Sequence, residues 1–490
     1  CFDTQARNII AHTMERDVTM RYEDMVHITL DTFQDRRNGY RFTVNPNGAR
    51  GYATVSNNTS LNKAWDGAWR SRSQKHAWGW STEVAIPFKS LSFNEKNDSW
   101  GINIYRNIGR FGERGQWANS RRTSRSYHVS GCGDLTGLHG LRQGMGLDIT
   151  PYVTGKYSKN YDSSDSDLLG DFGVDIRYRL TPSLTALASV NTDFAETEID
   201  TRQVNFTRFP LFFPEKRQFF LEDSGIFGFG GGESSRRRSR DSSDALLMPF
   251  FSRRIGLSSK GQITPIQFAG KVTGRIKDYN IGLLNAVVEG NDHPRNAFVA
   301  RLSRHVFEQS SFGFLTTVGD PNSDKMNSVT GIDFKYRNTD FMGGHTFEVN
   351  LYTLGSYSED LGGLEPAWAT NAKLYDRNIE LSASVIEIGN DFNPAMGFVR
   401  RQGTRRYMLA ADFIPYFEEI SWLRNTRHGY EAELYTDLGN DVVNTKQTFN
   451  LASLSFESQE MLSLSVSHHT DRPNKDFDIS DGTEIGRAHV

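Results

Sequence analysis

The sequence predicts an all-β protein, with an N-terminal antiparallel β-sandwich followed by a large antiparallel transmembrane β-barrel. Three observations support this prediction. No run of residues approaches the roughly 18 consecutive apolar residues that a membrane helix needs. About a dozen segments beyond residue 147 alternate apolar and polar residues, each near the roughly 9–11 residues of a membrane-spanning strand. Aromatic residues make up 12% of the chain and glycine contributes 44 residues, a composition that favours β-structure.

Residues 1–140 are predicted to form the β-sandwich, which we expect to be incomplete. Short strand-like runs such as MVHITLDTF, GYRFTVNP and SWGINIYRNI are separated by turns rich in Asn, Gly and Ser. Six of the eight tryptophans fall in this region: Trp65, Trp69, Trp78, Trp80, Trp100 and Trp117. Trp80 and Trp100 alternate with polar neighbours inside strands, so we expect both in the core. The glycine-rich stretch SGCGDLTGLHGLRQG then predicts a linker.

Residues 147–480 are predicted to form the barrel, and whether the chain holds all of its strands is left open. In DFGVDIRYRL (171–180), Phe172, Val174 and Ile176 lie on one side of a strand and Asp171, Asp175 and Arg177 on the other. Lipid on the apolar side and a water-filled interior on the polar side would explain the pattern. A soluble sandwich with one wet face has the same period and stays an alternative. Residues 484–490, EIGRAHV, resemble a translated sequencing adapter and are excluded as an artefactual tail.

Composition limits the kinds of ligand that we expect the chain to bind. The net charge is -3, so general nucleic-acid binding is not expected. Cys1 and Cys132 give neither a disulfide framework nor a metal-binding spacing. No cofactor is expected; the one candidate metal ion is Ca²⁺ at Asp31 and Asp35 in LDTFQDRRNG, whose carboxylates offer hard oxygen ligands. The alternative at this place is a turn in which Asp35 accepts hydrogen bonds from its own backbone and pairs with a nearby arginine.

Several motifs of the sequence resemble motifs of known protein families. LDTFQDRRNGYRFTVNPNGAR, WDGAW, GWSTEVAIPFKSLSF and WGINIYRNIGR resemble the family-nine-like carbohydrate-binding domain found at the start of certain bacterial envelope proteins. VNFTRFPLFFPEKRQFFLEDSGIF and FFSRRIG resemble the uncharacterised outer-membrane barrel family that follows it. The resemblance implies the outer membrane of a Gram-negative bacterium, with outer-membrane lipids and a glycan as partners. It also implies that a signal peptide, sandwich strands before Cys1 and barrel strands past 480 are missing from this fragment.

The resemblance further implies a sugar-binding site. Members of the carbohydrate-binding family hold a sugar between tryptophans, which makes Trp65, Trp69 and Trp117 candidates, with Asn103 and Arg106 as polar partners. We expect aromatic stacking on the apolar side of the sugar and hydrogen bonds to its hydroxyl groups.

The segment TRFPLFFPEKRQFFLED (207–223) is predicted to narrow or plug the barrel. Pro210 and Pro214 cannot sit in a paired central strand, so the segment belongs at a strand end or in a loop. We expect its charges to pair with charges of the wall such as Arg177, Arg179 or Glu198. An aromatic belt at the lipid interface is the alternative. The residues assigned to the constriction are Phe212, Phe213, Glu215, Lys216, Arg217, Phe219, Phe220 and Glu222.

The expected function is carbohydrate capture, uptake or another envelope role without covalent catalysis, and no catalytic residue is predicted. The sequence contains no nucleophile elbow, HExxH or P-loop. Two alternatives stay open: a glycan hydrolase or hydrolase-associated module acting on O-glycosyl bonds, and a soluble two-domain adhesin. Glu196, Glu198 and Asp200 alternate in FAETEID, so they share one face of a strand and would line a lumen as an acidic strip; a hydrolase would instead require two carboxylates about 5–10 Å apart with the pKa of one raised. The arginine-rich run 233–244 is either a solvated loop or a phosphate-binding patch. The oligomeric state is left open.

Overall fold

The computed structural model describes residues 1–490 with the exception of several short ranges. These exceptions are residues 18–19, 21, 57, 59, 64, 66, 119–124, 143–145, 160–165, 182, 193–209, 231–246, 259–263, 291, 308, 473–476, 481–482 and 486–490. Strands dominate, and the all-β prediction is confirmed. Within the described residues, no helix combines the length and the apolar character needed to cross a bilayer.

The chain divides into two compact units. Unit 1 comprises Cys1–Arg304, Phe314–Ser328 and Pro394–Phe398, and unit 2 comprises His305–Gly313, Val329–Asn393 and Val399–Val490. Short 3₁₀ turns link several strands: η1 (Ala6–Asn8), η2 (Phe88–Ser90), η3 (Gly109–Phe111), η4 (Val129–Gly131), η8 (Ser252–Arg254) and η9 (Glu359–Leu361).

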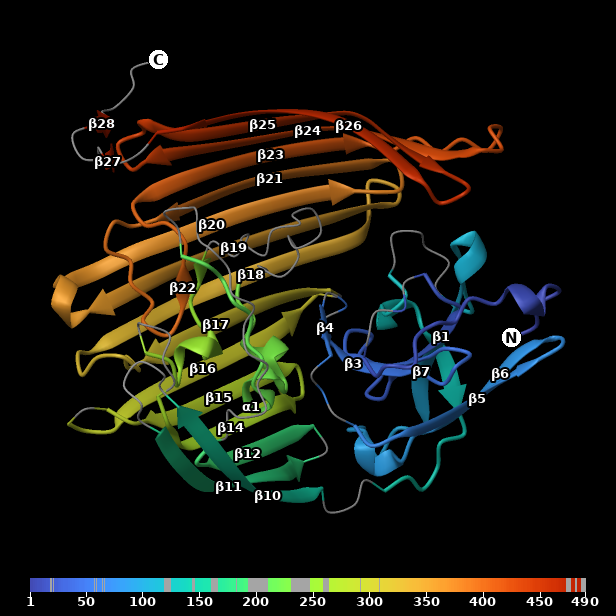
Figure 1. The fold of residues 1–490 in the computed structure, drawn as a ribbon, viewed down its shortest axis with the longest axis horizontal. Helices are drawn as coiled ribbons and strands as arrows, with labels where there is room; N and C mark the ends of the chain where they lie inside the picture. The colour runs from blue at the N-terminus through green and yellow to red at the C-terminus, as the bar shows by residue number, and fades with distance from the viewer. Residues whose placement is uncertain are drawn as a thin grey trace. The chain divides into compact units, whose positions relative to one another are not determined.

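The N-terminal part of unit 1 is built on one antiparallel sheet with the order β4-β3-β2-β1-β7-β8, to which β9 adds by pairing with β7 (Figure 1). Its strands are β1 (Met25–Asp31), β2 (Gly39–Val44), β3 (Arg50–Ser56), β4 (Ser60–Asn62), β7 (Ser99–Ile108), β8 (Glu113–Gln116) and β9 (Gly133–Thr136). A separate hairpin consists of β5 (Arg70–His76) and β6 (Gly79–Ala85).

An aromatic core covers one face of this N-terminal sheet. Its buried members are Leu30, Phe42, Val44, Tyr52, Trp69, Leu91, Phe93 and Trp100. Val84 of β6 packs against this cluster, which brings the hairpin into the core as a small second layer. Trp80 is 0% exposed and Trp100 is 3% exposed, so the prediction that both are core residues is confirmed.

In the part of the chain that the structure describes, most of the remaining strands form a 15-stranded sheet in which consecutive long strands lie side by side in chain order (Figure 1). The first are β10 (Leu147–Lys159), β11 (Ser166–Thr181), β12 (Leu184–Val190), β14 (Ile266–Ile276), β15 (Tyr279–Val288), β16 (Arg295–Val306) and β17 (Ser310–Val318). The others are β18 (Asn327–Phe341), β19 (His345–Ser358), β20 (Gly363–Tyr375), β21 (Ile379–Ile388), β23 (Thr404–Phe413), β24 (Leu423–Asp437), β25 (Val442–Phe456) and β26 (Met461–Asp471). Two small pairs lie outside it: β13 (Leu247–Met248) with β22 (Phe398–Val399), and β27 (Phe477–Ser480) with β28 (Thr483–Ile485).

In unit 1 the two faces of the large sheet differ in chemistry. Directly paired residues of neighbouring strands point to the same face. One cross-strand row contains Tyr178, Ala186, Val272, Leu283 and Ala300. Leu283 in this row is 41% exposed, and Phe172 on the same face is 60% exposed. The next row, on the opposite face, contains Arg177, Leu187, Lys271, Leu284 and Val299.

Unit 2 repeats this division between an exposed apolar face and a polar face. Leu351, Leu381 and Leu409 point to one face and are exposed. On the other face, Nε of Arg337 lies 3.1 Å from Oε1 of Glu348, and both side chains are buried. The apolar rows are therefore open to the surroundings rather than sealed between two stacked sheets. This is the reverse of a soluble core.

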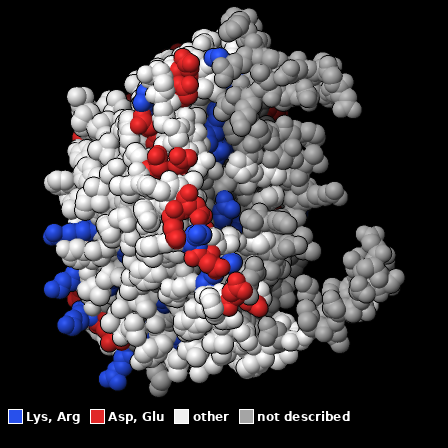
Figure 2. Space-filling model, turned by 90° about the vertical axis from the view of Figure 1, so that its left-hand side faces the viewer, with Lys and Arg blue, Asp and Glu red and all other residues white. Residues whose placement is uncertain are grey.

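Charged side chains on the molecular surface are unevenly distributed. In the view of Figure 2 they gather in a central band and along one margin, and uncharged surface lies between them. On the apolar face of unit 2, the ion pair Arg405–Glu387 (2.5 Å) lies one residue from the start of β23. A charge at a strand end is compatible with a membrane interface, where its cost is small.

Candidate functional site

The segment 210–230 folds against the polar face of β14–β16. Residues 210–217 are irregular, α1 (Gln218–Leu221) forms one helical turn, and η5 (Ser224–Phe227) follows. Asp223 between the two turns has a φ of 51°, in the left-handed region that non-glycine residues rarely adopt. The segment is therefore two short helical turns joined by a sharp bend.

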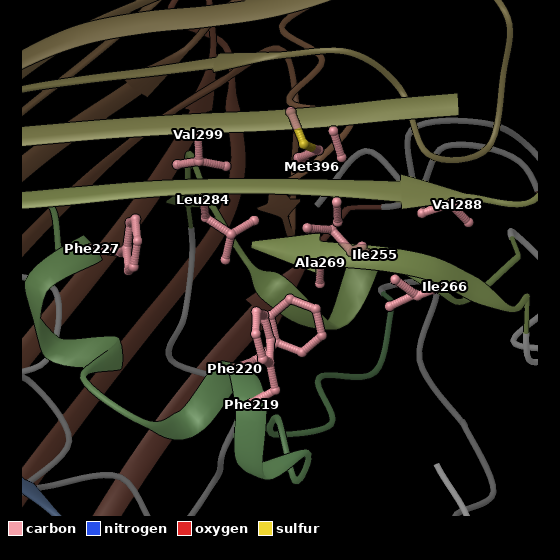
Figure 3. Packing of buried hydrophobic residues seen from close by; sticks show 12 residues of the cluster. Phe219, Phe220, Phe227, Ile255, Ile266, Ala269, Leu284, Val288, Val299 and Met396 are labelled. Carbon is pink, nitrogen blue, oxygen red and sulfur yellow. The ribbon is translucent and has the colours of Figure 1, made fainter. Parts of the chain in front are cut away.

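Apolar contacts anchor the segment to the sheet. Phe219, Phe220 and Phe227 are 7%, 3% and 6% exposed and pack in one cluster with strand residues that include Ala269 and Leu284 (Figure 3). Gly282 on β15 permits the close approach, since a Cβ atom there would lie 2.9 Å from Cγ2 of Ile226 and 3.0 Å from a ring carbon of Phe227. The wall is thus shaped to receive this segment.

Polar side chains of the sheet bind both the backbone and the carboxylates of the segment. Nζ of Lys271, a residue that is 2% exposed, donates to the carbonyl oxygens of Phe219 at 2.5 Å and Glu222 at 2.6 Å. Oγ1 of Thr273 donates to the Asp223 carboxylate at 2.8 Å. Arg177 from β11 donates to Glu222 at 2.6 Å. The carbonyl oxygens of Phe219 and Glu222 at the end of the short helix are thus satisfied by Lys271 of β14.

A second polar cluster holds the start of the segment. Arg217 donates from Nε and Nη2 to the two oxygens of Glu215, at 2.7 and 2.6 Å. It also donates to the backbone oxygens of Ile255 at 2.5 Å and Ser252 at 2.8 Å, and its guanidinium lies 4.2 Å from the ring centroid of Phe220. Burial acts to raise the pKa of Glu215, but the hydrogen bonds and charge of Arg217 outweigh it and hold this pKa below the usual value.

The eight residues assigned to the constriction lie together in this segment, but their charges pair differently from the expectation. Arg177 does contact the segment, through Glu222 rather than Glu215. Arg179 instead donates to the carbonyl oxygen of Lys89 at 3.3 Å. Glu215 pairs with Arg217 two residues away, a local pairing that the expectation did not include. Glu198 lies outside the described residues.

The remaining constriction residues flank this centre. Phe212 packs on Phe251 and Phe398, with ring centroids 5.0 and 5.4 Å apart. The ring of Phe213 lies 5.7 Å from the guanidinium of Arg253. The backbone N–H of Lys216 donates to Glu215 at 3.0 Å.

Sequence reasoning missed the residues of the wall that receive the segment. Lys271, Thr273 and Gly282 are ordinary polar or small residues of strands, and Ser252 at the start of η8 donates to Glu215 at 2.7 Å. The sequence did contain one sign of these wall residues. QFAGKVTGRI places lysine and threonine two residues apart, which puts both side chains on one face of a strand.

The three tryptophans proposed to bind sugar lie in different environments. Trp69 is 6% exposed and packs edge-on against Phe42 at 5.1 Å, within the core. Trp65 is partly buried, with its ring 4.9 Å from that of Tyr40. Trp117 is 63% exposed. A flat aromatic surface open to a ligand is therefore clearest at Trp117.

The two polar candidates lie on opposite faces of the N-terminal sheet. Both belong to β7, but they are three residues apart, and an odd separation places side chains on opposite sides of a strand. Asn103 is 1% exposed, and its side-chain oxygen accepts from the backbone N–H of Ala118 at 2.9 Å. Arg106 donates to the carbonyl oxygen of Phe2 at 3.0 Å. Asn103 and Arg106 cannot contact the same sugar without a rearrangement.

Asp31 and Asp35 form a tight turn. The Asp31 carboxylate accepts from the backbone N–H groups of Asp35 at 3.2 Å and Arg36 at 2.7 Å. Asp35 accepts from the N–H groups of residues 37 and 38 and pairs with Arg275. Across the described part of the chain, no three His, Cys, Asp or Glu residues gather as a metal site would require. Calcium at this turn stays a prediction.

The carboxylates Glu196 to Asp200 and the run 233–244 lie outside the described residues.

Comparison with known proteins gives one family match and several similar folds. Residues 144–307 match a family described as a domain of unknown function (DUF5916). No curated protein matches the chain. Pseudomonas aeruginosa OpdQ is similar with a TM-score of 0.34 and 8% identity, over 91% of this chain and 93% of that chain. P. aeruginosa OccK2 (OpdF), solved in complex with glucuronate, has a TM-score of 0.33 and 8% identity over 91% and 90%. A BenF-like porin from Pseudomonas fluorescens Pf-5 has a TM-score of 0.32 and 7% identity over 94% and 93%.

Proposed function

We propose that the chain is an outer-membrane β-barrel protein of a Gram-negative bacterium, with a polar channel that the segment 210–230 narrows and an N-terminal domain that captures glycans. The observation that carries this proposal is the reversed distribution of side chains in the large sheet. Apolar residues such as Leu283 and Leu409 are exposed, whereas charged residues such as Lys271 and Arg337 are buried on the other face. Lipid is the solvent in which such a surface is stable.

The segment 210–230 supports the proposed constriction. It lies on the polar face, so in a closed barrel it would occupy the lumen rather than the lipid. Its attachment combines three buried phenylalanines with the hydrogen bonds of Lys271, Thr273 and Arg177. Because each contact alone is modest, the segment can hold the channel narrow and still be displaced by a change in a few contacts.

The N-terminal domain would deliver sugars to the channel. The exposed ring of Trp117 offers a stacking surface, whereas Trp65 and Trp69 belong to the aromatic cluster on one face of the N-terminal sheet. We propose that a glycan stacks on the exposed ring of Trp117 without covalent chemistry, whereas Trp69, which is 6% exposed, supports the core of the domain. Uptake then follows from release into the polar interior of the barrel.

The proposal is tested by expressing the chain behind an outer-membrane export signal, followed by fractionation and recording in planar bilayers. The expected result is a membrane-bound protein with heat-modifiable mobility on gels and discrete conductance steps. Recovery of folded protein in the aqueous fraction would contradict the barrel and favour a soluble adhesin. Glycan binding is measured separately on an array, with Trp117→Ala as the variant expected to lose signal.

A further inference from the structure

The N-terminal domain contains a pocket on the face of its sheet opposite the tryptophan cluster. The pocket has a volume of about 260 Å³. His27, Arg41 and Thr43 from β1 and β2 contribute to its lining, together with Tyr105, Arg114 and Lys63. None of these residues belongs to the sugar-binding candidates described above.

The strand register builds this pocket from alternate residues. His27 pairs with both Thr43 and Tyr105, so the three side chains share a face. Phe42, one residue along β2, points into the aromatic core on the other side. Gly51 opposite Thr43 leaves space, because the nearest atoms to a Cβ there would be 3.7 and 4.0 Å away.

The pocket carries more positive than negative charge. Three cationic side chains, Arg41, Lys63 and Arg114, line it, against the single carboxylate of Asp17. Asp17 lies 3.2 Å from Arg16, which already offsets part of its charge. Nε of Arg41 is buried and, among the described residues, has no hydrogen-bond partner. An unsatisfied buried donor on a cation is costly, and a bound anion would satisfy it.

The rings of His27 and Tyr105 form a second part of the pocket lining. His27 stacks on Tyr105 with ring centroids 5.1 Å apart, and its Nδ1 lies 2.6 Å from Oγ1 of Thr43. Burial and the nearby charge of Arg41 lower the pKa of His27 well below its usual value, so the ring is neutral at neutral pH. Burial likewise lowers the pKa of Arg41 and of Lys63. A compact ligand with an anionic group would contact both the cationic side chains and the rings that line the pocket.

We propose that this pocket binds a small molecule through a carboxylate or phosphate group, with Arg41 as the central anchor and Lys63 and Arg114 beside it. The site goes beyond the proposed glycan capture and channel, because it uses neither the tryptophans nor the segment 210–230. It gives the N-terminal domain a means to recognise an acidic solute or a phosphorylated one.

The test is isothermal titration calorimetry on the purified full chain with three probes: inorganic phosphate, galacturonate and neutral galactose. We expect galacturonate or phosphate to bind at millimolar concentration or below, and the probe that binds identifies the anionic group. Arg41→Gln and Lys63→Gln should each weaken binding about tenfold or more, the loss expected for a charge-assisted hydrogen bond. Lys75→Gln on exposed β5 removes the same charge outside the pocket and should leave the affinity within about twofold.

Three outcomes would overturn the proposal. These are no binding of either anion at millimolar concentration, equal weakening by Lys75→Gln, or galactose binding as tightly as galacturonate. Lys63→Gln keeps the test decisive if Arg41→Gln fails to fold. Channel conductance of Lys63→Gln should equal that of the unmodified chain, so a failure of this site and a failure of the channel are distinguishable.

Discussion

Replacing Arg217 with alanine tests how the segment 210–230 is held. Arg217 is 6% exposed and donates to Glu215, Ile255 and Ser252. Its removal takes the Arg217 guanidinium away from the buried Glu215 carboxylate and takes a donor away from the Ile255 carbonyl oxygen, whereas the Ser252 carbonyl oxygen keeps the backbone N–H of Ile255. Breaking a buried ion pair in this way costs about 3–5 kcal/mol. Since each 1.4 kcal/mol changes an equilibrium constant tenfold, the population of the detached segment should rise by about 100-fold or more.

The assay combines chymotrypsin digestion with single-channel recording. Phe219 and Phe220 are buried, so cleavage after them requires the segment to leave the wall. Cleavage by a slow protease follows the population of the open form and should rise about 100-fold in Arg217→Ala. Conductance should rise in the same variant. Lys216→Ala removes one positive charge from the adjacent residue and serves as the control, with a much smaller expected change.

Arg217→Lys separates charge from geometry. Lysine keeps the charge but cannot form the two-pronged contact with Glu215, so an intermediate cleavage rate is expected. If Arg217→Ala leaves both cleavage and conductance at the level of Lys216→Ala, the segment is held by other contacts and the reasoning fails.

Four further changes have defined outcomes. Gly282→Val should displace the segment, because its side chain would overlap Ile226 and Phe227, and a rise in chymotryptic cleavage after Phe227 would show it. Leu409→Arg on the exposed face of β23 should lower barrel stability in lipid by about 2–4 kcal/mol in urea titrations, whereas Met408→Arg on the polar face, opposite Glu433, should cost less. Trp100→Ala should destabilise the N-terminal domain by about 3–5 kcal/mol in thermal or denaturant unfolding, since the ring is 3% exposed; a cost below about 1 kcal/mol would contradict its place in the core. Burial and the charge of Asp35 raise the pKa of Asp31 to about 7, so the folded state holds a proton that the unfolded chain releases; stability of this domain should fall as pH rises from about 4 to 7, and Asp31→Asn should flatten this slope in denaturant titrations.

The fold class could be predicted because strand periodicity is written into each segment. Phe172, Val174 and Ile176 alternate with Gly173, Asp175 and Arg177, and the paired register confirms that such rows lie on one face. The burial of Trp80 and Trp100 was likewise predictable from their neighbours within strands. Local sequence is sufficient for these features, since they depend on residues two apart.

The contacts of the site could not be predicted in the same way. Glu222 meets Arg177 across 45 residues, and Lys271 reaches the carbonyl of Phe219 across 52. Such pairs depend on how a loop of irregular backbone returns to the sheet, which no periodicity encodes. Pro210 and Pro214 indicated that this segment is not a paired strand, and its cluster of phenylalanines indicated that it is buried. The pairing of Arg217 with Glu215 depends on a local turn.

The most direct test of the central claim is an accessibility scan along β23 with a nitroxide label attached to single cysteines. The scan uses a background in which Cys1 and Cys132 are replaced by serine. If one face of the sheet touches lipid, labels at Tyr407, Leu409 and Phe413 should be relaxed by oxygen. Labels at residues 406, 408 and 410 should be shielded from oxygen and relaxed only by a water-soluble nickel chelate. Equal accessibility at alternate residues, or preference for the nickel chelate at Leu409, would contradict a lipid-facing sheet.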